Sequence, residues 1–258
     1  MHAVLSIAGS DSGGGAGIQA DLKTITCLGE YGMTAITALT AQNTMGVEGV
    51  EVVSVQMVKS QIDAVFGDIR PDAVKLGMIA TPDIMEAVCE KLIQYKAEHI
   101  VVDPVMVATS GSSLMESSTV RTLKEKLIPL ADIITPNISE AEVLSGISVE
   151  GKEDMVKAAE KIAEYYCGSI LIKGGHLTDT ADDLLYQNGE IIWLYGKRLD
   201  NENTHGTGCT LSSAIATFLA KGYSMEESVR QAKDYVTGAI AAGLNLGRGR
   251  GPLCHNYK

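Results

Sequence analysis

Short runs of apolar, often β-branched residues recur along the chain, and longer segments with helical periodicity separate them. The first kind of run predicts buried strands, and the second kind predicts amphipathic helices. The predicted strands cover residues 3–7, 34–39, 73–76, 100–102, 133–135 and 170–173. Because helical segments lie between these strands, the pattern predicts an α/β fold built from βαβ units around a mostly parallel sheet.

Three other stretches carry clear local signals. Apolar residues between positions 54 and 69 recur about every 3.6 residues, which predicts an amphipathic helix there. Asn188-Gly189 lies between two apolar runs and suits the positive φ angles of a two-residue turn, so a short antiparallel hairpin is predicted. Ser224 and Glu227 match a capping box, which predicts the start of a last helix.

The size and composition of the chain favour one domain. Its 258 residues are 45% hydrophobic and 21% charged, so the chain can bury a large core, and we expect a single domain over residues 1–258. Every apolar run is far shorter than the ~20 residues of a membrane-spanning helix. The sequence opens directly on a strand-like run without a signal-like segment, so a cytoplasmic protein that does not enter a membrane is expected.

Cysteine usage and net charge exclude several classes of protein. The five cysteines are scattered and never spaced as CxxC, which argues against a disulfide framework and against a zinc site. A formal charge of -11 opposes binding to nucleic acid or to anionic membranes. This charge does not exclude ATP, because local groups rather than net charge bind a nucleotide.

Polar segments follow five of the six predicted strands. In an open parallel sheet, ligands bind beyond the carboxyl ends of the strands, so these segments should meet at one edge. They are Gly9-Ser10-Asp11, Gln42-Asn43, Gly77-Met78, Asp103-Pro104 and Asn137.

A candidate anion site lies near the end of the chain. Gly206-Thr207-Gly208 stands directly before a predicted helix from Cys209 to Lys221. The unpaired N–H groups and the positive dipole end of such a terminus bind phosphate without a charged side chain. The alternative is a glycine-rich connection that binds no ligand.

Cys209 is an unusual residue at such a position. A thiol at a helix N-terminus can have a lowered pKa and act as a base, although a lone cysteine there is more often a small packed hydrophobe. His205 lies nearby and is a second candidate for the base, or simply a hydrogen-bonding loop residue.

The glycine-rich stretch from Gly9 to Gly17 fits neither common nucleotide signature. No Lys-Ser or Lys-Thr pair follows it, as a P-loop requires, and Ile18 stands where the third glycine of a dinucleotide motif belongs. The stretch predicts either a loop whose backbone approaches a ligand or an ordinary tight turn. Asp21 follows in the next helix, either near a ligand or in solvent.

Two strand ends carry groups suited to phosphate chemistry. Asp103, Asn137 and Glu140 offer oxygen atoms of the kind that Mg²⁺ prefers, although Asp103-Pro104 also suits a turn and Asn137 with Glu140 also suits a helix cap. Lys173 ends another strand, where it could neutralise a transferring phosphoryl group or simply extend into water.

Seven segments in this order resemble the hydroxymethylpyrimidine/phosphomethylpyrimidine kinases of thiamine biosynthesis, which belong to the ribokinase-like group. The segments are AGSDSGGGAGIQADLKT near the start, TALTAQNT at 37–44, KLGM at 75–78, VVDPVMVATSG at 101–111, TPNISEAE at 135–142, LIKGGH at 171–176 and NTHGTGCTLSSAIA at 203–216. The resemblance covers essentially the whole chain.

This resemblance implies a ribokinase-like three-layer sandwich with a mostly parallel central sheet and a homodimeric assembly. The implied activity is phosphorylation of 4-amino-5-hydroxymethyl-2-methylpyrimidine by ATP with Mg²⁺, and then of the monophosphate to the diphosphate. The implied ligands are the small pyrimidine and ATP.

The resemblance also implies roles for individual residues. The pyrimidine would lie among Gly9, Asp21, Gln42, Met78 and Val105. Phosphates would contact Lys173, Thr204, Gly206, Thr207 and Gly208, and magnesium with its waters would lie near Asp103, Asn137 and Glu140. Cys209, Lys173 and the amides of Gly206 and Gly208 would be the catalytic groups.

Cys209 stands where the wider ribokinase-like group has the aspartate base of a GxGD motif, and this substitution is typical of the pyrimidine branch. Two alternatives remain at this stage. A pyridoxal kinase of the same branch could share the cysteine, although Gln42 and Lys173 favour the pyrimidine kinases. A non-catalytic pyrimidine- or nucleotide-binding protein would explain the missing aspartate.

Overall fold

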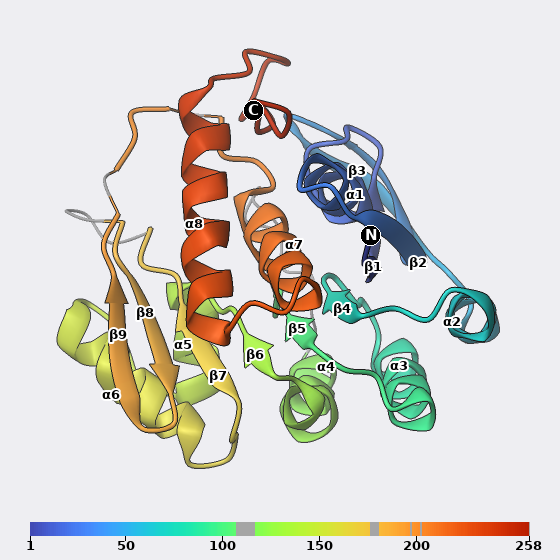
Figure 1. Cartoon of the computed structure of the whole chain (residues 1–258), viewed down its shortest axis with the longest axis horizontal. Coiled ribbons are helices and arrows are strands. Elements are labelled where there is room, and N and C mark those ends of the chain that lie inside the picture. The colour runs from blue at the N-terminus through green and yellow to red at the C-terminus, as the bar shows by residue number, and fades with distance from the viewer. Residues whose placement is uncertain (107–116, 176–180, 197, 202, 258) are drawn as a thin grey trace.

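Nine strands form one sheet in the order β3-β2-β1-β4-β5-β6-β7-β8-β9. The computed structural model (Figure 1) describes residues 1–106, 117–175, 181–196, 198–201 and 203–257. The strands are β1 Ala3–Asp11, β2 Tyr31–Asn43, β3 Gly46–Val52, β4 Ala73–Leu76, β5 Ile100–Val102, β6 Ile133–Ile134, β7 Ser169–Ile172, β8 Asp183–Gln187 and β9 Glu190–Leu194. Strands β2, β1, β4, β5, β6 and β7 run parallel, whereas β3, β8 and β9 pair antiparallel with their neighbours.

All six predicted strands are present, and so is the predicted hairpin. Asn188 and Gly189 have φ angles of 52° and 83° in the turn between β8 and β9, as a two-residue turn of this kind requires. Strand β3 was not predicted. Its residues are all exposed or half-buried, so it lacks the alternation of buried and exposed positions that marks a strand in sequence.

The helices are α1 Gly17–Cys27, α2 Val55–Asp68, α3 Pro82–Tyr95, α4 Ser117–Thr122, α5 Ile138–Ser145, α6 Lys152–Ala163, α7 Thr207–Ala220 and α8 Met225–Ala241. Helix α2 matches the predicted helix, with Ser54 as its N-cap. Ser224 caps α8 as expected and accepts a hydrogen bond from the Glu227 backbone N–H at 3.3 Å. No helix in these described ranges is both long and apolar enough to cross a lipid bilayer.

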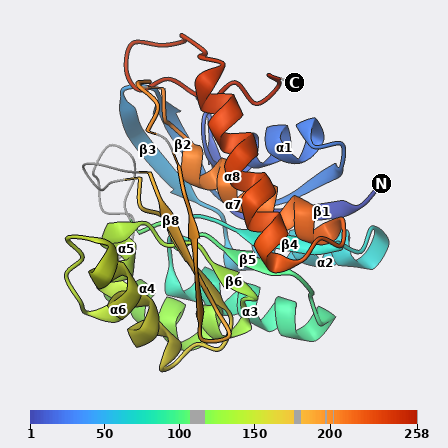
Figure 2. The same ribbon diagram turned by 60° about the vertical axis from the view of Figure 1, so that its left-hand side comes forward.

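Helices cover both faces of the sheet, which gives three layers (Figures 1 and 2). Leu5 and Ile7 of β1 point into a core with α2, α3, α5 and α6. Val4 points to the other face, into a core with α1, α7 and α8. The alternation of side chains between the two cores confirms the predicted α/β sandwich. The start of α7 lies at the carboxyl ends of the central strands.

Candidate active site

Helix α7 begins at Thr207, two residues earlier than predicted, and Gly206 is its N-cap. Gly206 has a φ of 86°, and a Cβ at this position would overlap the carbonyl oxygen of Gly15, so glycine is required on both counts. The N–H groups of Gly208 and Cys209 find no acceptor among the described residues. The helix start therefore offers free amides and a positive dipole end to an anion.

Lys173 and Asp103 lie directly against this helix start. Lys173 Nζ is 2.9 Å from Asp103 Oδ1, which also accepts a hydrogen bond from Thr135 at 3.1 Å. A Cβ on Gly208 would be 3.3 Å from both the Lys173 ammonium and the Asp103 carboxylate. Burial lowers the pKa of Lys173, but Asp103 and Glu140 outweigh it and hold that pKa above its usual value, so the lysine is charged at neutral pH.

Asn137 and Glu140 form a reciprocal capping box at the start of α5. Asn137 Oδ1 accepts from the Glu140 N–H at 2.9 Å, and Glu140 Oε2 accepts from the Asn137 N–H at 2.8 Å. Burial raises the pKa of Glu140 to about 7, with Lys173 opposing this shift and Asp103 adding to it. The two carboxylates near one lysine thus leave an excess of negative charge, although the side-chain oxygen of Asn137 is already used in the cap.

The glycine-rich loop is attached to the anion site through Asp11 and His205. Asp11 accepts hydrogen bonds from the backbone of Gly13, Gly15 and Ala16 at 2.8, 3.1 and 2.9 Å, and His205 Nε2 is 2.9 Å from its Oδ2. Burial opposes ionisation of Asp11, but these hydrogen bonds hold its pKa below the usual value. Asp11 was predicted only as part of the polar segment Gly9-Ser10-Asp11, although a carboxylate before a run of glycines is typical of a side chain that holds a turn.

His205 occupies a structural position in this arrangement. It is buried between Asp11 and Gly15, and its Nε2 is also 3.4 Å from Gln42 Nε2. The Thr40 hydroxyl lies 3.1 Å from Gln42 Oε1 and 2.8 Å from the Ser10 carbonyl oxygen. The amide nitrogen of Gln42 carries two N–H groups, so one is left for an acceptor on a ligand beside the contact with His205.

The remaining predicted substrate residues lie at the same sheet edge. Gly9 is packed against Met78, whose Cε would be 3.1 Å from a Cβ on Gly9. Val105 follows β5, and its N–H donates to the Asp103 carbonyl at 2.8 Å. Thr204 faces the helix start, where its carbonyl accepts from the Thr207 hydroxyl at 2.7 Å. Residues 107–111 of the VVDPVMVATSG segment and His176 of LIKGGH lie outside the described residues.

Asp21 is the residue whose expected place needs correction. It was expected to contact the pyrimidine or solvent, but its side chain is completely buried and ion-paired with Lys75, whose Nζ is 2.8 Å from Oδ2. The structure therefore places this carboxylate behind the substrate edge. Lys75 was overlooked, although a lysine inside the apolar strand AVKL requires a buried acidic partner and was a visible signal.

Cys209 lies in the first turn of α7 and is half-buried. The sequence left open whether this residue is a thiol with a lowered pKa or a small packed hydrophobe. Burial instead raises the pKa of the thiol to about 11; Lys75 and the Gly17 N–H oppose the shift, while Asp21 and Asp103 add to it. Desolvation and two nearby carboxylates thus outweigh Lys75 and the Gly17 N–H, and the thiol is protonated at neutral pH.

Comparisons with known proteins agree with this site. Residues 11–254 match the family described as phosphomethylpyrimidine kinase. The hydroxymethylpyrimidine/phosphomethylpyrimidine kinase of Streptomyces coelicolor is 48% identical over 254 residues, which cover 98% of this chain and 94% of that protein. The thiamine biosynthesis bifunctional protein ThiED of Geobacter sulfurreducens is also 48% identical over 98% of this chain, but the chain spans only 52% of its length.

A solved structure supports the fold assignment. The pyridoxal kinase of Bacillus subtilis, determined as an ADP complex, superposes with a TM-score of 0.92 at 38% identity and covers 99% of this chain and 97% of its own. The ribokinase-like resemblance inferred from the seven sequence segments is thereby confirmed. With a family match over nearly its whole length, this chain belongs to the phosphomethylpyrimidine kinase family.

Proposed function

We propose that this chain transfers the γ-phosphoryl group of ATP to the hydroxymethyl oxygen of 4-amino-5-hydroxymethyl-2-methylpyrimidine, and then phosphorylates the monophosphate to the diphosphate. The observation that carries the proposal is the free-amide start of α7 beside Lys173. In a loose phosphoryl-transfer transition state, charge spreads over the equatorial oxygens, so positioned amides and one ammonium supply most of the catalysis. Family membership supports the choice of substrate.

The acidic residues at this edge fit a magnesium ion. Asp103 and Glu140 carry two carboxyl groups beside one lysine, and burial, with Asp103 adding to it, raises the pKa of Glu140 to about 7. No cluster of three or more His, Cys, Asp or Glu ligands exists within the described residues, and Mg²⁺ commonly uses one or two carboxylates with waters and substrate phosphates. Bound magnesium would neutralise phosphate charge, while Asn137 holds Glu140 in place through the capping box.

Gln42 is proposed to recognise the pyrimidine ring. Its amide nitrogen carries two N–H groups, and beside the contact with His205 one of them is left for a ring nitrogen to accept. We expect Gln42→Ala to raise KM for the pyrimidine by ~10-fold and to leave KM for ATP and kcat within about twofold, because a ground-state contact is lost. Steady-state kinetics with each substrate varied will measure this. An unchanged KM for the pyrimidine would remove Gln42 from the substrate site.

A pyridoxal kinase is the second candidate, because a protein with that name superposes over almost the whole chain. Both substrates carry a hydroxymethyl group on an aromatic ring, so the fold alone does not separate them. The test is kcat/KM for hydroxymethylpyrimidine and for pyridoxal under identical ATP and Mg²⁺ conditions. A higher value for the pyrimidine supports the first function, and a clearly higher value for pyridoxal overturns it.

A homodimer is proposed as the working form. Val50 and Val52 of the edge strand β3 lie on one face of the strand and are 47% and 42% exposed, which leaves apolar side chains at the edge of the sheet. Natural proteins usually cover such edges. Sedimentation at micromolar concentration should give the mass of two chains, whereas a monomer at every concentration would contradict the proposal.

A further inference from the structure

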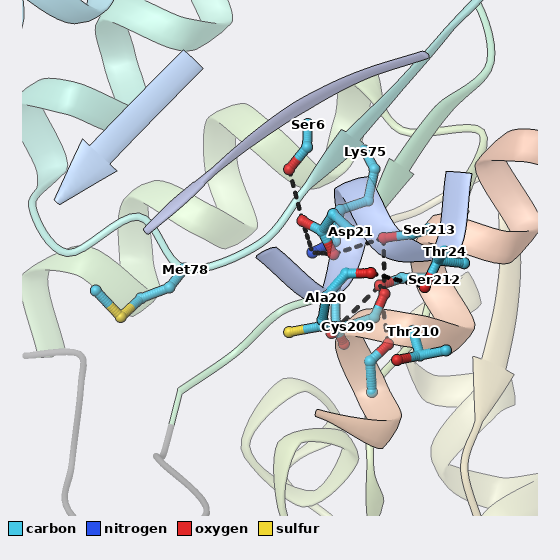
Figure 3. Close-up of polar contacts among 12 residues, drawn as sticks. Ser6, Ala20, Asp21, Thr24, Lys75, Met78, Cys209, Thr210, Ser212 and Ser213 are labelled. Carbon is cyan, nitrogen blue, oxygen red and sulfur yellow. Dashed lines mark hydrogen bonds and ion pairs between the residues drawn. The ribbon is translucent and has the colours of Figure 1, made fainter. Parts of the chain in front are cut away.

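Asp21 and Lys75 form a completely buried ion pair beneath the candidate active site (Figure 3). Lys75 Nζ lies 2.9 and 2.8 Å from the two carboxylate oxygens of Asp21. Ser6 donates to one of these oxygens and Ser213 to the other, each at 2.5 Å. The carboxylate thus joins β1, α1, β4 and α7 at one point.

This pair is connected to Cys209 in two ways. The Ser213 hydroxyl, which lies against Asp21, is also 2.8 Å from the carbonyl oxygen of Cys209. The backbone N–H of Gly17, the first residue of the helix that carries Asp21, favours the thiolate of Cys209. A displacement of Asp21 would therefore be passed to the first turn of α7, where the anion site lies.

Packing alone does not account for the pair. A buried ion pair gives up the hydration of both charges, and apolar residues of similar size often stabilise a core as well or better. Ser6 and Ser213, both fully buried, contact the pair on the face of the sheet that α1 and α7 cover, whereas Leu5 and Leu76 point into the core on the other face. The retained charges point to a role in the chemistry of the site.

Electrostatics supplies that role. The charged groups that face the Cys209 thiol come from every element around it: Lys75 of β4, Asp21 of α1, and Asp103 and Lys173 at the ends of β5 and β7. Lys75 favours the thiolate, whereas Asp21 and Asp103 favour the thiol. Burial would lower the pKa of Lys75, but Asp21 raises it above the usual value, so the lysine is charged.

We propose that the Asp21–Lys75 pair is a positioning element for Cys209, which fixes the first turn of α7 through Ser213 and sets how readily the thiol exchanges a proton. This inference rests on the proposed function, because it assigns the thiol a part in phosphorylation of the hydroxymethyl group. Asp21 and Lys75 act through Cys209 and touch no substrate atom.

The first test uses charge changes of opposite sign. Asp21→Asn leaves Lys75 uncompensated and should increase the rate of iodoacetamide alkylation of Cys209 at pH 8 by at least threefold. Lys75→Met leaves Asp21 uncompensated and should decrease this rate by at least threefold. Mass spectrometry of the peptide that contains Cys209 separates it from the other four cysteines, Cys27, Cys89, Cys167 and Cys254. Matched controls are Asp63→Asn and Lys91→Met, which break an ion pair of 2.8 Å between α2 and α3.

The second test needs no charge change in the core. Ser213→Ala removes the link to Cys209 but keeps the pair, and it should reduce kcat for the hydroxymethyl substrate by ~10-fold with KM for ATP unchanged. Phosphorylation of the monophosphate should change by less than about threefold, because its acceptor is already a phosphate oxygen. If Asp21→Asn or Lys75→Met fails to fold, the Asp21→Asn/Lys75→Met double variant, which restores neutrality, should alkylate within about twofold of the unaltered protein.

The outcomes distinguish a failure of the positioning role from a failure of the proposed function. Shifts of the same sign for Asp21→Asn and Lys75→Met, or an equal loss in both phosphorylation steps for Ser213→Ala, would overturn the positioning role. So would a double variant whose alkylation rate departs from that of the unaltered protein by more than threefold. Alkylation needs no turnover, so a failure of the proposed substrate would show in the activity assays while this readout stayed interpretable.

Discussion

Lys173→Met is expected to lower kcat for phosphorylation of the pyrimidine by ~10³-fold. Its ammonium lies beside the free amides of α7 and is kept charged by Asp103 and Glu140. Removing one preorganised protein group that stabilises charge on a transferring group commonly lowers the rate by about 10²–10³-fold. The loss is larger where water is excluded. Methionine keeps the length of the side chain, so packing against Gly208 changes little. Steady-state kinetics at saturating ATP and Mg²⁺ measures the effect.

The control for this variant is Lys59→Met. Lys59 also pairs with a carboxylate, that of Glu90, at 2.5 Å on the surface, and its removal should leave kcat within about twofold. A thermal unfolding curve for Lys173→Met shows whether Asp103, left without its ion-pair partner, has destabilised the fold. A folded variant with kcat within threefold of the unaltered protein would place phosphoryl transfer elsewhere.

Cys209→Ala is expected to lower the rate of the first phosphorylation by ~10²-fold or more. The rate of the second phosphorylation should remain largely unchanged. A base that takes the proton of an alcohol commonly increases the rate by about 10²–10⁴-fold. The monophosphate needs no such base, because its acceptor oxygen is already ionised. The backbone N–H of residue 209 survives the change, so the anion site is retained. Equal losses in the two steps would instead indicate damage to the anion site.

The pH dependence of the first step gives an independent check on Cys209. Its thiol has a pKa raised to about 11, so it is protonated at neutral pH and the thiolate fraction rises ~10-fold for each unit of pH below that value. Single-turnover rates of the first step should therefore rise between pH 7 and 9, and this rise should vanish in Cys209→Ala. A flat profile in the unaltered protein would contradict proton removal by the thiolate.

Periodicity was sufficient to predict most of the fold. Buried strands such as residues 73–76 and 100–102 are mostly apolar, and their observed bounds agree with the predicted ones. Strand β3 could not be predicted because neither of its faces is buried. The early start of α7 was missed because Gly206-Thr207-Gly208 has poor helix propensity, which the packing of Gly206 against Gly15 overrides.

Only part of the site was predicted, because the sequence gives the order of the residues and not their contacts in the folded chain. Strand ends correctly brought Lys173 next to Asp103. Asp21 of α1 meets Lys75 of β4, a residue 54 positions away in the sequence. Lys75 was therefore not recognised as its partner. The direction of the Cys209 pKa could not be decided from the sequence, since burial and the two carboxylates that raise it come from the tertiary fold.

The most direct test of the central claim is product analysis by ³¹P NMR with the unaltered protein, ATP, Mg²⁺ and hydroxymethylpyrimidine. The proposed function predicts a monophosphate ester first and a diphosphate later, with one ADP formed at each step and no ADP without the pyrimidine. Binding of the pyrimidine with no phosphorylated product, or ADP release unaffected by it, would contradict the claim.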